Sequence, residues 1–251
     1  VFMFLSGANF VLHFHAIKGR MLGHYFKDPE FRFYAAVVLG MIALISANLF
    51  SEGRYVAFRD ALRAAAFQVA SIITTTGFIS ADYERWPYFS KSIICAGLFL
   101  GGCAGSTAGG IKQIRLLAMT NCVGQRLRKM LNPRAVLMVP IGSSTLEPMV
   151  MSSCMAFFGL YFMVFAAGAF AISLFEPDLM TSIAGAATAL GNVGPAFGDL
   201  SATDNFAGQC PEAKWIFSFL MLCGRLELYT VFALFSGAFW REGIITGDGT
   251  D

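Results

Sequence analysis

The order of apolar and polar positions along the chain predicts a series of membrane-spanning helices. Residues 33–50 and 149–175 are apolar runs without a charged residue, and about 20 such residues are enough to cross the hydrocarbon core of a bilayer. Three other runs are apolar but less regular, namely 2–17, the glycine-containing 88–111, and 215–240, which carries Arg225 and Glu227. The pattern predicts an all-α polytopic membrane protein.

Two shorter segments alternate with these runs and predict re-entrant helices. Residues 57–73 and 179–190 are too short or too polar to span, and each is followed by a glycine-containing polar break. Gly77 lies 44 residues after Phe33, and Gly194 lies 45 residues after Met149. This agreement indicates a duplicated unit of helix, pore helix and helix, repeated in parallel orientation.

The two polar breaks, TTTG at 74–77 and GNVGP at 191–195, are candidates for ion contact. Backbone without helical hydrogen bonds is tolerated at membrane depth only where it is packed in protein or lines a wet cavity. Freed carbonyls there can replace the hydration shell of a cation, and glycine supplies the backbone angles. The alternative, a helix kink with packing glycines, would have to occur twice at matching positions.

Composition and charge support the membrane interpretation. Only 14% of residues are charged, whereas a soluble domain has about 25%, and the mean hydropathy is +0.62. Six basic and no acidic residues lie between Lys112 and Arg134, which the positive-inside rule places in the cytoplasm. The acidic stretch from Glu176 to Glu212 is expected on the opposite side. Binding of the anionic leaflet accounts for the basic segment, so no nucleic-acid partner is predicted.

Candidate catalytic and metal-binding groups are sparse. The six cysteines form no CxxC motif, and all three histidines precede residue 25, so no nucleophile and base or metal cluster falls within the predicted spans. His13 and His15 leave a metal site open, although two residues apart on a helix they do not share a face. We predict that the protein is not an enzyme. Because Val1 lies inside an apolar run without an initiator Met, we also expect a fragment.

Four motifs carry a family resemblance that covers nearly the whole chain. They are ITTTGF at 73–78, GGCAGSTAGGIKQIRLL at 101–117, GNVGPAFG at 191–198 and MLCGRLELYTVFALF at 221–235. Together they resemble the TrkH branch of the Trk/Ktr/HKT superfamily of potassium transport proteins. The resemblance implies K⁺ uptake through a gated selectivity filter, as the membrane subunit of a Trk system. A less selective Na⁺/K⁺ pathway of the Ktr/HKT type is the alternative.

The resemblance also implies an architecture of four helix, pore-helix, helix repeats around one potassium-channel-like pore. Residues 1–24 would be the last helix of repeat two, 25–134 repeat three with a gate loop, and 135–251 repeat four. Two filter strands are then expected, and K⁺ would lie at Thr75, Thr76, Asn192 and Val193. The strands comprise Thr74, Thr75, Thr76, Gly77 and Phe78, and Asn192, Val193, Gly194 and Pro195.

The glycine-rich run 101–110 is expected to unwind, because each glycine in a helix costs about 1 kcal/mol relative to alanine. A phosphate-binding loop is excluded, since Ile111 stands where its lysine is required. By resemblance, the run 101–110 is an intramembrane loop that acts as a gate. A charged side chain in the middle of a span needs a partner inside the protein. Arg225 is therefore expected to donate hydrogen bonds to carbonyls of this loop. The gate residues are Gly101, Gly102, Gly105, Ser106, Thr107, Gly109, Gly110 and Arg225.

By resemblance alone, we expect a homodimer that binds a TrkA-type cytosolic nucleotide-binding ring. The expected location is a bacterial inner membrane, crossed several times, with membrane lipid around the spans. No cofactor is expected, and K⁺ is the transported ion. The basic segment 112–134 is a candidate docking surface for the ring.

Overall fold

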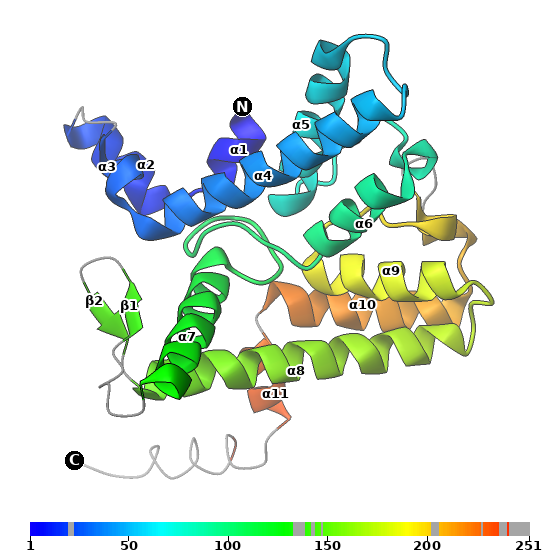
Figure 1. The fold of residues 1–251 in the computed structure, drawn as a ribbon. Helices are drawn as coiled ribbons and strands as arrows, with labels where there is room; N and C mark the ends of the chain where they lie inside the picture. Colours follow the sequence, from blue (N-terminus) through cyan, green and yellow to red (C-terminus); the bar gives the residue numbers. More distant parts are fainter. Residues whose placement is uncertain are drawn as a thin grey trace.

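The computed structural model describes residues 1–19, 23–132, 139–141, 144–146, 148–201, 206–226, 228–235 and 240, and it is almost entirely helical (Figure 1). The expected counter-charge Glu227, the basic residue Arg134 and the boundary at 134–135 lie outside the described residues. The α-helices are α1 (Phe2–Ser6), α2 (Phe10–Gly19), α3 (Gly23–Lys27), α4 (Pro29–Ser51), α5 (Phe58–Ile73), α6 (Tyr88–Gly97), α7 (Gln113–Leu131), α8 (Pro148–Ser173), α9 (Leu179–Gly191), α10 (Pro211–Arg225) and α11 (Leu228–Leu234). Three 3₁₀ turns (Tyr83–Arg85, Gly198–Leu200 and Phe206–Gly208) and an antiparallel hairpin of β1 (Val139–Ile141) and β2 (Ser144–Leu146) complete the elements.

Two long helices confirm the two uninterrupted apolar runs. Helix α4 begins at Pro29, where the Asp28 carboxylate accepts a hydrogen bond from the Phe31 amide at 2.7 Å and caps the first turn. Helix α8 covers the run 149–175 and ends two residues early, at Ser173. By length and composition these two helices can cross a membrane, and α10 with α11 would make a third if the bent pair is one span.

The two short helices that the sequence predicts as re-entrant also form where it predicts them. Helix α5 packs against α4, and α9 packs against both α8 and α10. Both helices are buried on every face in their last turns, α5 from Gln68 to Ile73 and α9 from Ala184 to Gly191. A short helix that is apolar on all sides must be enclosed by other elements. Because α9 is enclosed in this way, the position of the break that follows it is also fixed.

The three remaining apolar runs are each broken, and this corrects two of the predictions. The run 2–17 is not one helix but α1 and α2, and the run 215–240 is not one continuous helix but contains α10 and α11, which meet at 112°. The run 88–111 ends as a helix at Gly97 and continues as a loop to Lys112, as expected from its glycines. The breaks in the runs 2–17 and 215–240 both contact the loop that interrupts the run 88–111.

Contacts with the loop explain the break between α1 and α2. The Gly7 carbonyl accepts a hydrogen bond from the Cys103 amide at 2.8 Å, and the Phe10 amide donates to the Gly105 carbonyl at 3.2 Å. A Cβ atom at Gly7 would lie 2.5 Å from the Tyr34 hydroxyl oxygen, so glycine is required there. The helix is therefore interrupted because its backbone bonds to a segment about 100 residues away, which a local apolar pattern does not report.

Candidate ion filter and gate

The backbone has the same conformation in both polar breaks. Thr75 and Asn192 adopt left-handed angles, with φ of +51° and +56°, and the glycines two residues later have φ of +74° (Gly77) and +111° (Gly194). Left-handed backbone is rare for a β-branched residue such as threonine. Its presence at Thr75, in register with Asn192, supports the interpretation of the breaks as equivalent structures.

Backbone hydrogen bonds follow the same scheme in the two breaks. The Thr76 amide donates to the Ser71 carbonyl at 2.9 Å, and the Val193 amide donates to the Thr188 carbonyl at 3.0 Å. Each bond runs from the first residue after the left-handed position to the residue five places back. The breaks are therefore ordered turns at the ends of α5 and α9.

The two breaks also lie against each other. A Cβ atom at Gly77 would lie 2.5 Å from the Val193 carbonyl oxygen and 3.3 Å from the Pro195 Cδ atom. Side chains do not approach a backbone oxygen that closely, so only glycine fits at position 77. Segments more than 100 residues apart thus converge at one place.

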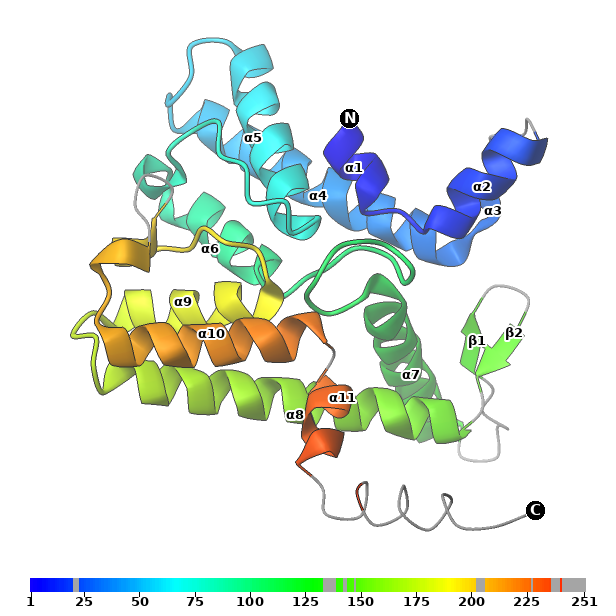
Figure 2. The same ribbon diagram turned by 180° about the vertical axis from the view of Figure 1, so that it is seen from behind.

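The segment between α6 and α7, residues 98–112, is unwound and lies in the middle of the molecule in both ribbon views (Figures 1 and 2). We call it the gate loop, after the role that the sequence analysis expects of it. Its two ends are held together, since the Gly101 amide donates to the Ile111 carbonyl at 2.9 Å and the Ile111 amide donates to the Phe99 carbonyl at 3.0 Å. Gly105 and Gly110 have positive φ. The expected unwinding is confirmed, and the loop is a compact turn.

The gate loop touches the first break directly. The Gly109 amide donates a hydrogen bond to the Thr75 hydroxyl at 2.8 Å. A Cβ atom at Gly109 would lie 2.5 Å from the Gly191 carbonyl oxygen and 3.1 Å from the Asn192 Cβ atom, so the loop also fits closely against the second break. Movement of the loop would therefore be transmitted to both breaks.

Two cationic side chains hold the tip of the gate loop. The Arg225 guanidinium donates to the Thr107 carbonyl at 3.0 Å, which confirms the expected hydrogen bond between this arginine and a loop carbonyl. The Lys112 ammonium donates to the Ala108 carbonyl and, at 3.5 Å, to the Ser106 carbonyl. The carbonyls of three successive loop residues, 106–108, thus accept hydrogen bonds from two cationic side chains. Sequence reasoning predicted Arg225 as a donor but not Lys112.

Glu30 is the residue of this site that sequence reasoning missed. It lies in the first turn of α4 and is only 6% exposed, and its carboxylate accepts hydrogen bonds from the amides of Ala104 at 2.6 Å and Ile114 at 3.0 Å. These amides belong to the gate loop and to the first turn of α7. Acidic residues are common in the first turn of any helix, where they interact favourably with the helix dipole. The local sequence therefore did not distinguish Glu30 from an ordinary helix-terminal charge.

A cavity of about 280 Å³ lies beside the gate loop tip. Lys112, Arg115 and Arg225 line it, with Phe157 and Tyr161 of α8 on another wall. The Arg115 guanidinium lies over the Phe157 ring, 3.8 Å from its centroid. The ring stabilises the positive charge of Arg115 through a cation–π interaction. Positive charge dominates the described residues around the cavity, and it raises the energy of a cation that enters.

Metal binding by the histidines is not supported. His13 Nδ1 lies 2.6 Å from the Tyr25 hydroxyl and Nε2 lies 2.9 Å from the Leu5 carbonyl, so both ring nitrogens have protein partners. In the part of the chain that the structure describes, no three histidine, cysteine or acidic side chains are grouped as metal ligands. His13 therefore has a structural role.

Comparison of the chain with known proteins identifies its family. The profile of the TrkH family, described as cation transport protein, matches residues 1–242. The chain belongs to the TrkH family. It is 37% identical over 242 residues to the Trk system potassium uptake protein TrkH of Salmonella typhimurium, a match that covers 96% of the chain and 50% of that protein. The corresponding protein of Halomonas elongata is also 37% identical, over 96% of the chain and 49% of its own length.

The fold agrees with a solved TrkH structure. The crystal structure of the potassium transporter TrkH from Vibrio parahaemolyticus superposes with a TM-score of 0.89 at 34% identity, covering 96% of this chain and 51% of that one. The chain therefore spans about half the length of the relatives it matches. The expected fold class, with parallel helix, pore-helix, helix repeats of a potassium-channel-like pore, is confirmed, and the TrkH family comprises cation transport proteins and not enzymes.

The position of Glu30 in this TrkH chain gives a first prediction. Replacing Glu30 by alanine leaves the part-buried amides of Ala104 and Ile114 without their acceptor, at a total cost of about 1–3 kcal/mol. We expect a lower temperature of thermal unfolding in detergent for Glu30→Ala. Glu30→Gln keeps a carbonyl oxygen in place and should unfold close to the wild type. Equal unfolding temperatures for the alanine variant and the wild type would contradict the anchoring role.

Proposed function

We propose that the chain forms part of a K⁺ uptake pathway, as the membrane subunit of a Trk system in a bacterial inner membrane. Membership of the TrkH family supports cation transport, and the relatives named above are Trk system potassium uptake proteins. The observation that carries the proposal is the convergence of two breaks with matching backbone angles at one place beside the gate loop.

In this proposal the breaks are two strands of a selectivity filter. Carbonyl oxygens at Thr75 and Thr76, and at Asn192 and Val193, contact K⁺ and replace its hydration shell. The remaining filter residues, Thr74, Gly77, Phe78, Gly194 and Pro195, shape the turns. The positive φ angles of Gly77 and Gly194 support this assignment, since they reverse the direction in which neighbouring carbonyls point.

The gate loop controls passage below the filter. Gly101, Gly102, Gly105, Gly109 and Gly110 let the loop fit against neighbouring backbone, and Ser106 and Thr107 present carbonyls at its tip. Arg225 holds the tip closed through its hydrogen bond to Thr107 and repels cations from the cavity beneath. Opening then requires that this bond be broken.

A less selective Na⁺/K⁺ pathway of the Ktr/HKT type is the second candidate. Each break carries a single glycine at the filter position, Gly77 or Gly194, and a filter with fewer constrained residues imposes a less rigid cage on the ion. The ratio of K⁺ to Na⁺ flux separates the two candidates.

The proposed organisation follows the family. Residues 1–24 end repeat two, 25–134 form repeat three and 135–251 form repeat four, in a homodimer surrounded by membrane lipid. A TrkA-type cytosolic ring would carry the nucleotide sites and dock near the basic segment 112–134. K⁺ is the transported ion in this proposal, which invokes no cofactor.

Ion flux tests the proposal in the complete protein reconstituted in liposomes. We expect K⁺ uptake by the wild type and its loss in Gly77→Ala, because position 77 has φ of +74° and a Cβ there would meet the Val193 carbonyl. Gly53→Ala is the matched control. Gly53 also has positive φ, +64°, but a Cβ there meets nothing within 4 Å, so this variant should transport normally. Equal K⁺ flux in both variants would contradict the filter assignment, and absence of flux in the wild type would contradict the function.

A further inference from the structure

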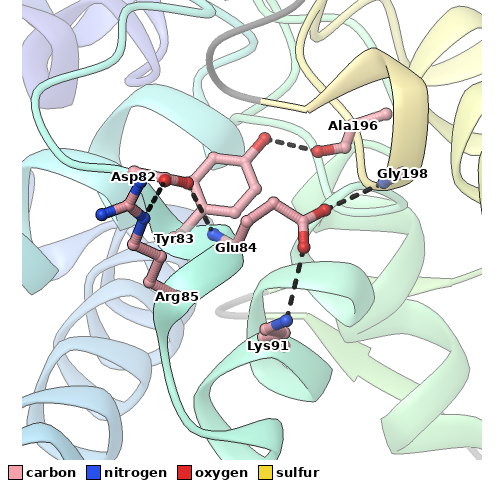
Figure 3. Close-up of polar contacts among 7 residues, drawn as sticks. All are labelled: Asp82, Tyr83, Glu84, Arg85, Lys91, Ala196 and Gly198. Atoms are coloured by element: carbon pink, nitrogen blue, oxygen red, sulfur yellow. Dashed lines mark hydrogen bonds and ion pairs between the residues drawn. The ribbon is translucent and has the colours of Figure 1, made fainter.

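A tyrosine from the segment 78–87, which we call the outer loop, reaches the backbone that follows the second break. The Tyr83 hydroxyl donates a hydrogen bond to the Ala196 carbonyl at 2.7 Å, across 113 positions of sequence (Figure 3). The side chain is 1% exposed, and its ring packs edge-on against Phe197 with centroids 5.2 Å apart. Burial, with a smaller contribution from the carboxylates of Glu84 and Asp82, raises the pKa of the Tyr83 phenol. The hydroxyl therefore keeps its proton and acts as a donor.

Glu84, the next residue, makes a second connection to the same backbone (Figure 3). One carboxylate oxygen accepts from the Gly198 amide at 2.9 Å, and the other accepts from the Lys91 ammonium at 3.3 Å. Asp82 fixes the turn, because it accepts from the Glu84 amide at 3.1 Å and pairs with Arg85 at 3.0 Å. The Tyr83 and Glu84 side chains, which we call the outer clasp, thus hold the segment 196–198 at two points.

The segment held by the outer clasp is continuous with the second break. Ala196 directly follows Pro195, and the Pro195 carbonyl accepts from the Thr188 hydroxyl at 2.9 Å. Two successive carbonyls after Gly194 are therefore bound by side chains, one from α9 and one from the outer loop. At Gly198 the backbone has φ of +72°, and a Cβ would meet the Thr181 hydroxyl, so this end of the segment is also fixed.

The side-chain bonds that support the first break differ from those of the second. Ser71 occupies the position equivalent to Thr188, but its buried hydroxyl has no hydrogen-bond partner among the residues that the structure describes. In contrast, the Thr188 hydroxyl both donates to Pro195 and accepts from the Gly194 amide at 3.0 Å. The first break is held instead by the Thr74 and Thr76 hydroxyls, 2.7 Å apart, and by the Gly109 amide, whereas the outer clasp acts on the segment after the second break.

We propose that Tyr83 and Glu84 are positioning residues that set the discrimination between K⁺ and Na⁺ by fixing the backbone at Ala196 and Gly198, directly after the second break. This inference rests on the proposed transport function. K⁺ and Na⁺ differ in radius by a fraction of an ångström, so discrimination depends on how rigidly the carbonyls are held and on how many reach the ion. A clasp that only stabilised the fold would change protein yield and unfolding temperature and leave the ratio of the two ions unaltered.

The test compares K⁺ and Na⁺ flux through the complete protein in liposomes under equal gradients. We expect the ratio of K⁺ to Na⁺ flux to fall by about threefold or more in Tyr83→Phe, which removes only the donor to Ala196. Glu84→Ala should shift the ratio in the same direction, and its half-buried side chain makes misfolding a smaller risk. If Tyr83→Phe does not fold, the ratio for Glu84→Ala decides the matter.

Two control variants make the same chemical changes away from the filter. Tyr229→Phe removes a tyrosine hydroxyl that donates to the Ser153 carbonyl at 3.0 Å, and Glu52→Ala removes an exposed carboxylate at the end of α4. Both should keep the wild-type ratio. Unchanged ratios in the Tyr83 and Glu84 variants, with wild-type K⁺ flux retained, would overturn the inference alone. Absence of K⁺ flux in the wild type would overturn the proposed function, and the inference with it.

Discussion

Replacing Arg225 by alanine in the complete protein is expected to raise K⁺ flux measured without the cytosolic regulator by about tenfold, the effect of losing one charge-assisted hydrogen bond. The Arg225 guanidinium donates to the Thr107 carbonyl at 3.0 Å and places a positive charge beside the cavity under the gate loop. Its removal both releases the loop tip and lowers the energy of a cation in that cavity. The measurement is the initial rate of K⁺ or Rb⁺ uptake into liposomes.

Two further variants separate the bond from the charge. Arg225→Lys keeps the positive charge but replaces the planar guanidinium with a single ammonium, so it should give an intermediate rate if geometry contributes. Arg126→Ala removes an exposed arginine of α7 and should leave the rate unchanged. An unchanged or reduced flux in a folded Arg225→Ala protein would count against the gating role.

Gly224→Ala is expected to destabilise the protein by about 1–3 kcal/mol, the usual cost of overpacking, and to abolish selective flux. A Cβ at this position would run into the Leu190 carbonyl oxygen and lie 2.5 Å from the Asn192 amide nitrogen. Backbone at the end of α9 cannot move aside as a flexible side chain would. The Asn192 side chain would also lose its hydrogen bond to the Met221 carbonyl, which measures 3.1 Å.

Gly124→Ala is the matched control for that change. Gly124 also lies in a helix, α7, but a Cβ there meets nothing within 4 Å. Alanine should therefore be neutral, or stabilising by about 0.5–1 kcal/mol through its better helix propensity. Thermal unfolding in detergent compares the two variants. Similar unfolding temperatures for both would show that α10 and α9 are less closely packed than the structure indicates.

The pattern of apolar and polar residues was sufficient to locate the long helices, the two short helices and the breaks that follow them. Apolar runs predicted α4 and α8, the short segments predicted α5 and α9, and threonine, asparagine and glycine marked the breaks. These signals are local, because a residue's polarity and its backbone preference act wherever it stands in the chain. The density of glycines in 101–110 predicted an unwound loop for the same reason.

The sequence failed where a helix is broken by contact with a distant segment. The run 2–17 has the polarity of one helix, yet Gly7 gives its carbonyl to Cys103. The run 215–240 is apolar on both sides of Arg225, yet α10 stops there and the guanidinium turns to Thr107. An apolar pattern shows that a segment prefers lipid or the protein core to water. It does not show which backbone groups of that segment form hydrogen bonds with residues far away in the sequence.

By itself, the sequence determined that this is a membrane protein with two equivalent polar breaks, a glycine loop and an arginine in need of an interior partner. Only the tertiary structure decided that Glu30 anchors the loop, that Lys112 shares its tip with Arg225, and that Tyr83 holds Ala196. Glycine content and hydropathy are properties of neighbouring residues along the chain. The hydrogen bonds of Glu30 and Tyr83 join residues 74 to 113 positions apart, and they exist only once packing has brought those segments together.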